Sequence, residues 1–168
     1  ELLERAKETS LSVVQNKVRA WVVDQFHRYW YDAENTWRQN QFLGFGVKQL
    51  PSDLWLYQEI IHSIRPRFIV QTGVSEGGSI VFFCHLLDLI GAPSDAVVVG
   101  IDIQLTPSAR RISHPRARLI EASSVDPKTV ERVAPMMKPG AMVLDLCCGT
   151  GDVLLALEKR RGAPVLGS

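Results

Sequence analysis

The chain has 168 residues, of which 46% are hydrophobic and 22% are charged, a composition that suits one globular domain with its own apolar core. Its formal net charge is +1, which argues against electrostatic binding to nucleic acid or an anionic membrane surface. No apolar run is long enough to span a bilayer, and the three cysteines show neither metal-ligand nor disulfide spacing. We therefore expect a cytoplasmic protein with reduced thiols.

The first part of the chain is expected to be mainly helical. Apolar residues recur at three- and four-residue spacings within residues 1–31, which predicts a helix with one apolar stripe. Residues 32–51 contain glycines and a proline that break helices, so we expect irregular structure there. We assign residues 1–51 to an N-terminal helical extension and residues 52–168 to a partial ligand-binding domain.

A second helix is expected before the first strand. Ser52 or Asp53 can cap its N-terminus, and its apolar pattern runs to about Ile64. Pro66 prevents the helix from continuing, because the residue before a proline avoids the helical conformation.

From residue 68 onward, short apolar runs typical of buried strands alternate with segments typical of helices. The expected strands are 68–70, 96–103, 117–120 and 142–146, with a further element beginning near 165. The expected helices are 76–90, 126–137 and 150–160. This alternation predicts the α/β class, with a parallel, doubly wound sheet of Rossmann-like type. Ligands of such sheets bind beyond the carboxyl ends of the strands.

Three glycines lie in the turn after the first strand. Gly73 allows a tight turn and a close approach of a ligand to the backbone. Gly77, Gly78 and Ser79 open the next helix, whose N-terminal amides suit a carboxylate or a phosphate. The spacing matches neither the dinucleotide-binding motif nor the P-loop. A glycine-rich turn without a ligand is the alternative interpretation.

An acidic residue, Asp102, ends the second strand. A carboxylate at this place can accept hydrogen bonds from ribose hydroxyl groups. The alternative is a solvated loop carboxylate or a helix cap. Taken together with the glycine-rich turn, Asp102 indicates a ligand that contains adenosine.

Two stretches carry a family resemblance, Lys48–Ile61 (KQLPSDLWLYQEII) and Arg65–Ser79 (RPRFIVQTGVSEGGS). Together they resemble the cephalosporin-hydroxylase-like family, which includes the rhamnosyl O-methyltransferases, and the match extends over roughly residues 20–145. The resemblance implies a class I, Rossmann-like methyltransferase domain that binds S-adenosylmethionine and is preceded by helices. It also implies O-methylation of a hydroxyl of a sugar, glycolipid or natural product, often with a divalent metal such as Mg²⁺.

The resemblance also implies roles for particular residues. The loop that holds the methionine part of the cofactor corresponds to Gln71, Thr72, Gly73, Gly77, Gly78 and Ser79. Asp102 matches the ribose-binding acid, Ser123 and Ser124 match the segment near the adenine, and Asp145 resembles a metal ligand. The family usually has Glu at the position of Gln71, so this chain lacks a charge there.

A second resemblance overlaps the end of the chain. Residues 143–153 (VLDLCCGTGDV) are similar to the first-strand cofactor motif of ubiquinone/menaquinone-type C-methyltransferases, in which Asp145 would end a first strand. In one explanation, residues 141–168 are the fourth strand and following helix of the first family. In the other, they come from a different methyltransferase. Both explanations imply S-adenosylmethionine.

The expected sheet is cut short at its C-terminal end. The acidic pair that completes the metal site in the family would follow the next strand, beyond Ser168. An open sheet edge favours pairing, so we expect a homo-oligomer or aggregation. The alternative function is a non-catalytic module that binds a nucleoside or a protein partner, favoured by Gln71 and the missing edge.

Overall fold

The computed structural model describes residues 2–138, 141–146, 156–157, 159 and 165–167. The chain forms two compact units, residues 1–39 and residues 40–168. Residues 40–51 thus belong to the second unit, whereas the sequence analysis places them in the N-terminal extension. Among the described residues, no helix has both the length and the apolar character needed to cross a membrane.

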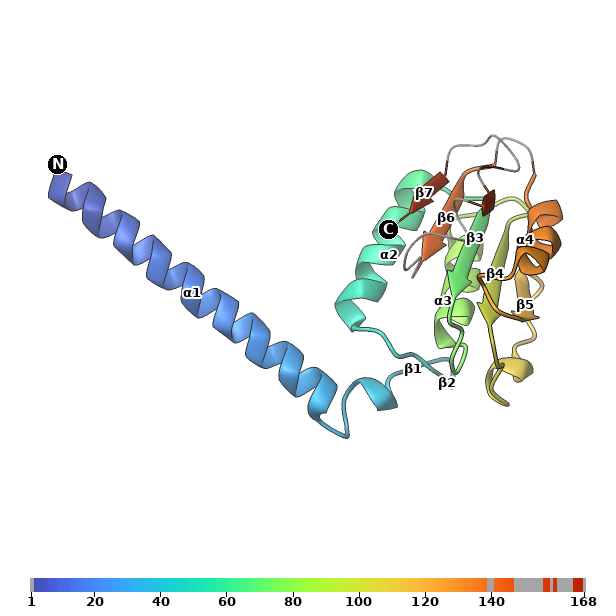
Figure 1. Ribbon diagram of the computed structural model, residues 1–168, viewed down its shortest axis with the longest axis horizontal. Helices are drawn as coiled ribbons and strands as arrows, with labels where there is room; N and C mark the ends of the chain where they lie inside the picture. Colours follow the sequence, from blue (N-terminus) through green and yellow to red (C-terminus); the bar gives the residue numbers. More distant parts are fainter. Residues whose placement is uncertain (1, 139–140, 147–155, 158, 160–164, 168) are drawn as a thin grey trace. The chain divides into compact units, whose positions relative to one another are not determined.

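The first unit consists of the long helix α1 (Leu2–Asp32) and the short 3-10 helix η1 (Trp37–Gln39) (Figure 1). The expected N-terminal helix is therefore present. Its end is held by Thr36, whose hydroxyl donates to the carbonyl oxygens of Trp30 and Ala33. Apolar side chains of the predicted stripe, including that of Trp21, are exposed to solvent.

The second unit contains the alternating strands and helices. Its strands are β1 (Gln41–Phe42), β2 (Phe45–Gly46), β3 (Phe68–Thr72), β4 (Val97–Asp102), β5 (Ala117–Glu121), β6 (Val143–Leu146) and β7 (Val165–Gly167). Its helices are α2 (Pro51–Ile64), α3 (Gly78–Leu89) and α4 (Pro127–Val133), with the 3-10 turns η2 (Ala109–Arg111) and η3 (Ala134–Met136). The antiparallel hairpin β1–β2 lies in the region for which irregular structure was expected.

Five parallel strands form the main sheet, in the order β5-β4-β3-β6-β7. In this register Val70 of β3 pairs with Val99 of β4 on one side and with Asp145 of β6 on the other. This order confirms the placement of residues 143–146 as the fourth strand of one sheet. The glycines of the second motif, at 149 and 151, and most of the helix predicted over 150–160 lie outside the described residues.

The sheet is covered on both faces, as a doubly wound sheet requires. Successive residues of β3 point to opposite sides. Ile69 packs with Ile61 of α2 and Phe83 of α3, whereas Phe68 packs with Val133, which ends α4. Figure 1 shows these helices around the sheet. The predicted α/β class is therefore confirmed in its architecture.

The two ends of α2 are set by residues close to them in the sequence, and one prediction about its N-terminus is wrong. The predicted caps of α2, Ser52 and Asp53, are wrong: the N-cap is Leu50, because Pro51 occupies the first helical position. A proline suits that position, since its missing N–H would have no partner there. The helix ends as predicted before Pro66, with Arg65 in the left-handed conformation at φ 46°.

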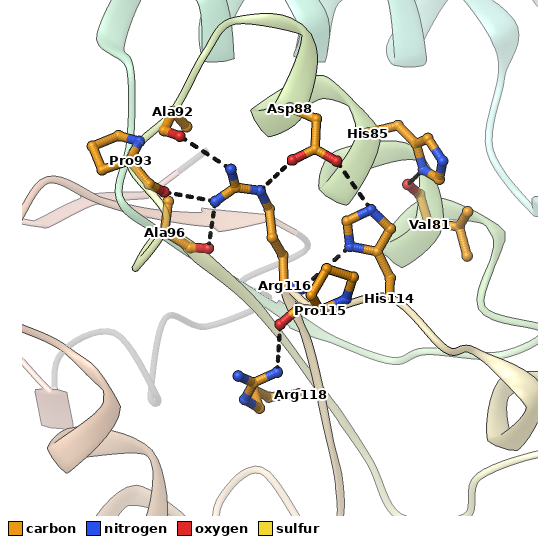
Figure 2. A network of polar contacts seen from close by, with 10 residues as sticks. All are labelled: Val81, His85, Asp88, Ala92, Pro93, Ala96, His114, Pro115, Arg116 and Arg118. Atoms are coloured by element: carbon orange, nitrogen blue, oxygen red, sulfur yellow. Dashed lines mark hydrogen bonds and ion pairs between the residues drawn. The ribbon is translucent and has the colours of Figure 1, made fainter.

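A polar network joins the start of β5 to the end of α3 (Figure 2). The Arg116 guanidinium donates to Asp88 at 2.6 Å and to the carbonyl oxygens of Pro93, Ala96 and Ala92 at 2.7, 3.0 and 3.0 Å. Its side chain is only 12% exposed. The hydrogen bond from Arg116 holds the pKa of the Asp88 carboxyl below its usual value. Arg116 therefore connects α3, the loop that follows it and the start of β5.

We predict that Arg116→Met lowers the free energy of unfolding by about 2–3 kcal/mol, because three carbonyl groups and one carboxylate lose a charged donor. Chemical denaturation of the full-length protein measures this change. The matched control is Arg118→Met, since Arg118 is exposed and bonds only to neighbouring carbonyl oxygens, such as that of Pro115. We expect a change within about 0.5 kcal/mol for the control. Equal losses in the two variants would contradict the role given to Arg116.

Candidate cofactor site

The turn after β3 exposes its backbone at Gly73. This residue has φ 80°, which L-residues with a side chain rarely adopt, and a Cβ built on it meets no atom within 4 Å. Its N–H donates to the carbonyl oxygen of Ile101 at 2.8 Å, which holds the turn against β4. A ligand can therefore approach the backbone closely at this position.

Asp102 lies directly against that turn. Its Oδ2 accepts hydrogen bonds from the N–H groups of Val74 at 2.7 Å and Ser75 at 3.1 Å. Its Oδ1 accepts from the N–H of Gln104 at 3.2 Å. Burial by itself raises the pKa of this carboxyl, but the backbone N–H donors outweigh it, so the pKa is lowered overall. Asp102 is therefore a carboxylate at neutral pH.

The two places predicted to converge on one ligand are thus in contact. Four backbone N–H groups, those of Val74, Ser75, Gln104 and Ile103, act on the Asp102 carboxylate, which has about four lone-pair sites. The side chain is partly exposed, so a ligand can reach it from that side. The predicted ribose-binding role therefore fits the geometry.

Gly77 and Gly78 are needed for packing within the protein. A Cβ on Gly78 would lie 2.5 Å from the carbonyl oxygen of Gly46 and 2.7 Å from that of Phe45. A Cβ on Gly77 would lie 2.5 Å from Ile112 Cδ1, and Gly77 has φ 89°. The hairpin and the segment after β4 therefore cover this part of the loop on two sides, while Gly73 stays open.

The segment after β4 also binds the loop through hydroxyl groups. Thr106 Oγ1 donates to the carbonyl oxygen of Ser75 at 2.9 Å, and Ser108 Oγ donates to that of Glu76 at 3.1 Å. The backbone of the loop is therefore held in place without a ligand. Such preorganisation reduces the conformational entropy that binding would cost.

A cavity of about 150 Å³ lies beside the loop. It is lined by Gly46, Lys48, Gln49, Gln71, Gly73, Val74, Ser75 and Ser79. The predicted residues Gln71, Gly73 and Ser79 thus share one hollow. Gly46, Lys48 and Gln49 were not predicted, because they come from the segment expected to be irregular. The only signal for them in the sequence is their position within the family resemblance.

Gln71 is a buried polar residue of this cavity, as Ser79 is, and only 3% of its surface is exposed. Its Nε2 donates to the carbonyl oxygen of Gly73 at 2.7 Å. Its Oε1 is buried and has no hydrogen-bond partner among the described residues. A buried acceptor without a partner costs free energy unless a ligand or water supplies a donor.

The remaining predicted cofactor residues lie along the same edge of the sheet. Thr72 is the last residue of β3 and pairs with Ile101. Ser123 and Ser124 follow β5, and the N–H of the preceding Ala122 donates to the Asp102 carbonyl oxygen at 2.8 Å. Together with Asp102 at the end of β4, these residues therefore lie at the carboxyl ends of the three adjacent strands β3, β4 and β5.

Asp145, the predicted metal ligand, lies in β6 with its side chain fully buried. Burial raises the pKa of its carboxyl to about 6. Within the described ranges, no three His, Cys, Asp or Glu side chains gather where they could hold a metal ion. Mg²⁺ needs close to six oxygen ligands, and one carboxylate does not make such a site. The described residues therefore do not build a metal centre.

Comparison with known proteins identifies the family. The family model for rhamnosyl O-methyltransferase/CmcI matches residues 34–149. The chain belongs to this family. The resemblance inferred from the sequence is therefore confirmed, and the matched range contains the hairpin, the glycine-rich loop, Asp102 and Asp145.

Curated relatives are longer than this chain. The rhamnosyl O-methyltransferase of Mycobacterium tuberculosis (strain ATCC 25618 / H37Rv) is 32% identical over 145 residues, which cover 83% of this chain and 58% of that protein. The rhamnosyl O-methyltransferase of Mycobacterium leprae (strain TN) is 30% identical over 113 residues, covering 67% of this chain and 48% of that protein. The chain thus spans about half the length of the relatives it matches.

Solved structures support the fold. The apo structure of CmcI-N160 superposes with a TM-score of 0.60 at 22% identity, covering 83% of this chain and 63% of that chain. CmcI-D160 with Mg and SAM superposes with a TM-score of 0.54 at 20% identity and the same coverage. These likenesses confirm the predicted Rossmann-like architecture.

We predict that Gly78→Ala lowers the free energy of unfolding by about 2–3 kcal/mol, because the new methyl group meets two backbone carbonyl oxygens that cannot move independently. Gly91→Ala is the matched control, since Gly91 has φ 64° and open space around its Cβ position. Left-handed strain alone costs about 1 kcal/mol at that site. Denaturation curves measure both values, and a smaller loss for Gly78→Ala than for Gly91→Ala would contradict the packing role.

A second prediction concerns the pH dependence of stability. An acid whose pKa is higher in the folded protein than in the unfolded chain destabilises the fold as pH rises. For Asp145 the loss of stability develops between about pH 4 and pH 6, because the pKa of its carboxyl is 3.8 in the unfolded chain and about 6 in the folded protein. Asp145→Asn should therefore be more stable than wild type by about 2–3 kcal/mol at pH 8 and about equally stable at pH 4.

Thermal unfolding at both pH values, without and with MgCl₂, measures this difference and also tests the metal-ligand prediction. Stabilisation by MgCl₂ in wild type and not in Asp145→Asn would support Asp145 as a ligand. A pH profile that is the same for wild type and variant would contradict the raised pKa.

Proposed function

We propose that this chain forms the S-adenosylmethionine-binding part of an O-methyltransferase that acts on a hydroxyl group of a sugar, glycolipid or natural product. The observation that carries the proposal is the contact of Asp102 with the N–H groups of Val74 and Ser75, beside the open backbone of Gly73. This contact lies at the carboxyl ends of adjacent parallel strands, where ligands of such sheets bind. Membership of the rhamnosyl O-methyltransferase/CmcI family supports the reaction class.

The described residues fit an adenosyl ligand with an amino-acid end. Asp102 would accept hydrogen bonds from the ribose hydroxyls, and Ser123 and Ser124 would border the adenine. The cavity beside Gly73 would hold the methionine part, where Gln71 Oε1 is a buried acceptor. Thr72, Gly77, Gly78 and Ser79 complete the loop, with the glycine pair shaping it rather than contacting the ligand.

S-adenosylmethionine supplies an electrophilic methyl group on a positively charged sulfur. Bound at this loop, it would give that methyl group to the acceptor hydroxyl oxygen and leave as the neutral thioether S-adenosylhomocysteine, and the hydroxyl proton would pass to water. The contribution of this chain is to hold the ligand in one orientation, because alignment of the reacting atoms accounts for much of the rate of such transfers. The loop is suited to this role, since Thr106 and Ser108 hold its backbone.

The relatives' names suggest the class of acceptor. Those relatives are named rhamnosyl O-methyltransferases, so deoxyhexosyl groups are the first acceptors to test. Asp145 is the candidate ligand for a divalent metal such as Mg²⁺, which would need further ligands besides this carboxylate.

We expect the full-length protein to bind S-adenosylmethionine and S-adenosylhomocysteine in isothermal titration calorimetry. Asp102→Asn should weaken this binding by about tenfold or more. The amide is uncharged, and its NH₂ group donates hydrogen bonds where a carboxylate oxygen accepted them. Asp126→Asn is the matched control: Asp126 caps α4 by accepting from the N–H of Lys128 at 2.9 Å, and Asn caps helices equally well.

Mass spectrometry of rhamnosides incubated with the protein and S-adenosylmethionine then tests methyl transfer. The expected result is a mass gain equal to CH₂, because a methyl group replaces the hydrogen atom of the hydroxyl. Binding without transfer would favour the alternative of a non-catalytic module. Binding of neither cofactor form by wild type would end the proposal.

A further inference from the structure

The described lining of the cavity beside Gly73 combines one cationic side chain with neutral polar side chains, among them the buried amide of Gln71. Lys48 is the charged side chain among its described lining residues, and Gln71 contributes the buried amide. Within the part of the chain that the structure describes, no carboxylate lies within ion-pairing distance of the Lys48 ammonium. Lys48 therefore has no ion-pair partner among the described residues, while the carboxylate of Asp102 lies behind the cavity wall and binds the N–H groups of Val74 and Ser75.

The position of Lys48 is set by its neighbours. Val47 is buried at 2% exposure, and its N–H donates to the carbonyl oxygen of Asn40 at 2.8 Å. The same segment packs so closely on Gly78 that a Cβ there would lie 2.4 Å from Val47 Cγ2. Lys48 thus follows a residue anchored on the first turn of α3, although its own side chain is exposed and can move.

The first turn of α3 adds to the positive potential. α3 is a twelve-residue helix from Gly78 to Leu89, and Ser79 in its first turn lines the cavity. The N-terminus of a helix carries partial positive charge and unpaired N–H groups, which favour an anion. Lys48 and this helix end therefore act on the same hollow with the same sign.

Gln71 suits a different kind of ligand group, a hydrogen-bond donor. Its Nε2 is used by the Gly73 carbonyl oxygen, so the amide orientation leaves Oε1 as an acceptor. That oxygen is buried without a partner among the described residues, and Gln71 is one of the residues that line the cavity. The cavity therefore offers charge to an anion and a neutral acceptor to an N–H donor.

An α-amino acid group has this combination, a carboxylate beside an ammonium. The volume of about 150 Å³ suits such a group, since a cavity of about this size holds a molecule as large as benzene but not a nucleoside. We propose that Lys48 binds the α-carboxylate of the ligand and that Gln71 accepts a hydrogen bond from its α-ammonium. Lys48 is then a specificity-determining residue supplied from outside the parallel sheet. This assignment rests on the proposed function, because S-adenosylmethionine is the ligand that brings the amino-acid group.

The charge arrangement makes the carboxylate the stronger anchor. Lys48 and the helix end attract it, whereas the ammonium meets only the neutral Gln71. Hydrogen bonds to charged groups contribute more than those between neutral groups. The site should therefore discriminate strongly against a ligand that keeps the ammonium but lacks the carboxylate.

Calorimetry of the full-length protein with three ligands tests this assignment. The ligands are S-adenosylmethionine, decarboxylated S-adenosylmethionine, which lacks only the carboxylate, and 5′-deoxy-5′-methylthioadenosine, which lacks the whole amino-acid end. Lys48→Met should weaken binding of S-adenosylmethionine by about tenfold or more and change the other two affinities by less than about twofold. Lys128→Met, which removes an exposed lysine on α4, is the matched control and should change none of them.

Gln71→Glu provides an independent readout. A carboxylate in place of the amide adds attraction for the ammonium, so binding of both ammonium-bearing ligands should tighten relative to methylthioadenosine. If this variant weakens all three ligands equally, the assignment of Gln71 is wrong.

Two outcomes for Lys48→Met would overturn the assignment of the lysine. One is unchanged affinity for S-adenosylmethionine. The other is an equal loss for all three ligands, which would mean that Lys48 supports the hairpin rather than the carboxylate. Failure of wild type to bind any of the three ligands would instead refute the proposed function, so the two failures are distinguishable.

Discussion

The hydrogen bonds from Val74 and Ser75 to the Asp102 carboxylate are the interaction on which the candidate site depends. They join the turn after β3 to the end of β4, at 2.7 and 3.1 Å. A carboxylate that accepts backbone N–H groups stays ionised, and its charge in turn fixes where those N–H groups point. The open face of Gly73 and the cavity next to it follow from that arrangement.

Two segments from outside the parallel sheet complete the loop. The hairpin β1–β2 places carbonyl oxygens against Gly78, and the segment after β4 places Ile112 against Gly77. Protein thus covers the loop on two sides at Gly77 and Gly78, while Gly73 stays exposed beside the cavity. Because a rigid site loses little conformational entropy on binding, this enclosure favours a ligand that must be held in one orientation.

The polar network of Arg116 has a comparable role at the opposite ends of the strands. It binds the loop between α3 and β4 to the start of β5, so that the strands carrying Asp102 and Ser123 keep their register. A buried cation among carbonyl oxygens stabilises a fold only when its donors are all used, as those of Arg116 largely are. The register of the strands in turn fixes the positions of the site residues at their carboxyl ends.

The sequence by itself determined the elements with strong local patterns. The β-branched run at 97–102 and the capped helix after Asp126 depend on neighbouring residues only, and the structure has both. Gly73 and Asp102 could also be predicted, because the ends of parallel strands meet at one edge of a sheet. The tertiary structure decided what depends on contacts between distant residues: the two-residue strands of the hairpin, the packing role of Gly77 and Gly78, and Lys48 in the wall of the cavity. A short hairpin has too little local preference to be visible in the sequence, and a two-stranded hairpin needs packing to be stable. That packing comes from α3, where Phe42 contacts Phe82 and His85 and Val47 lies against Gly78.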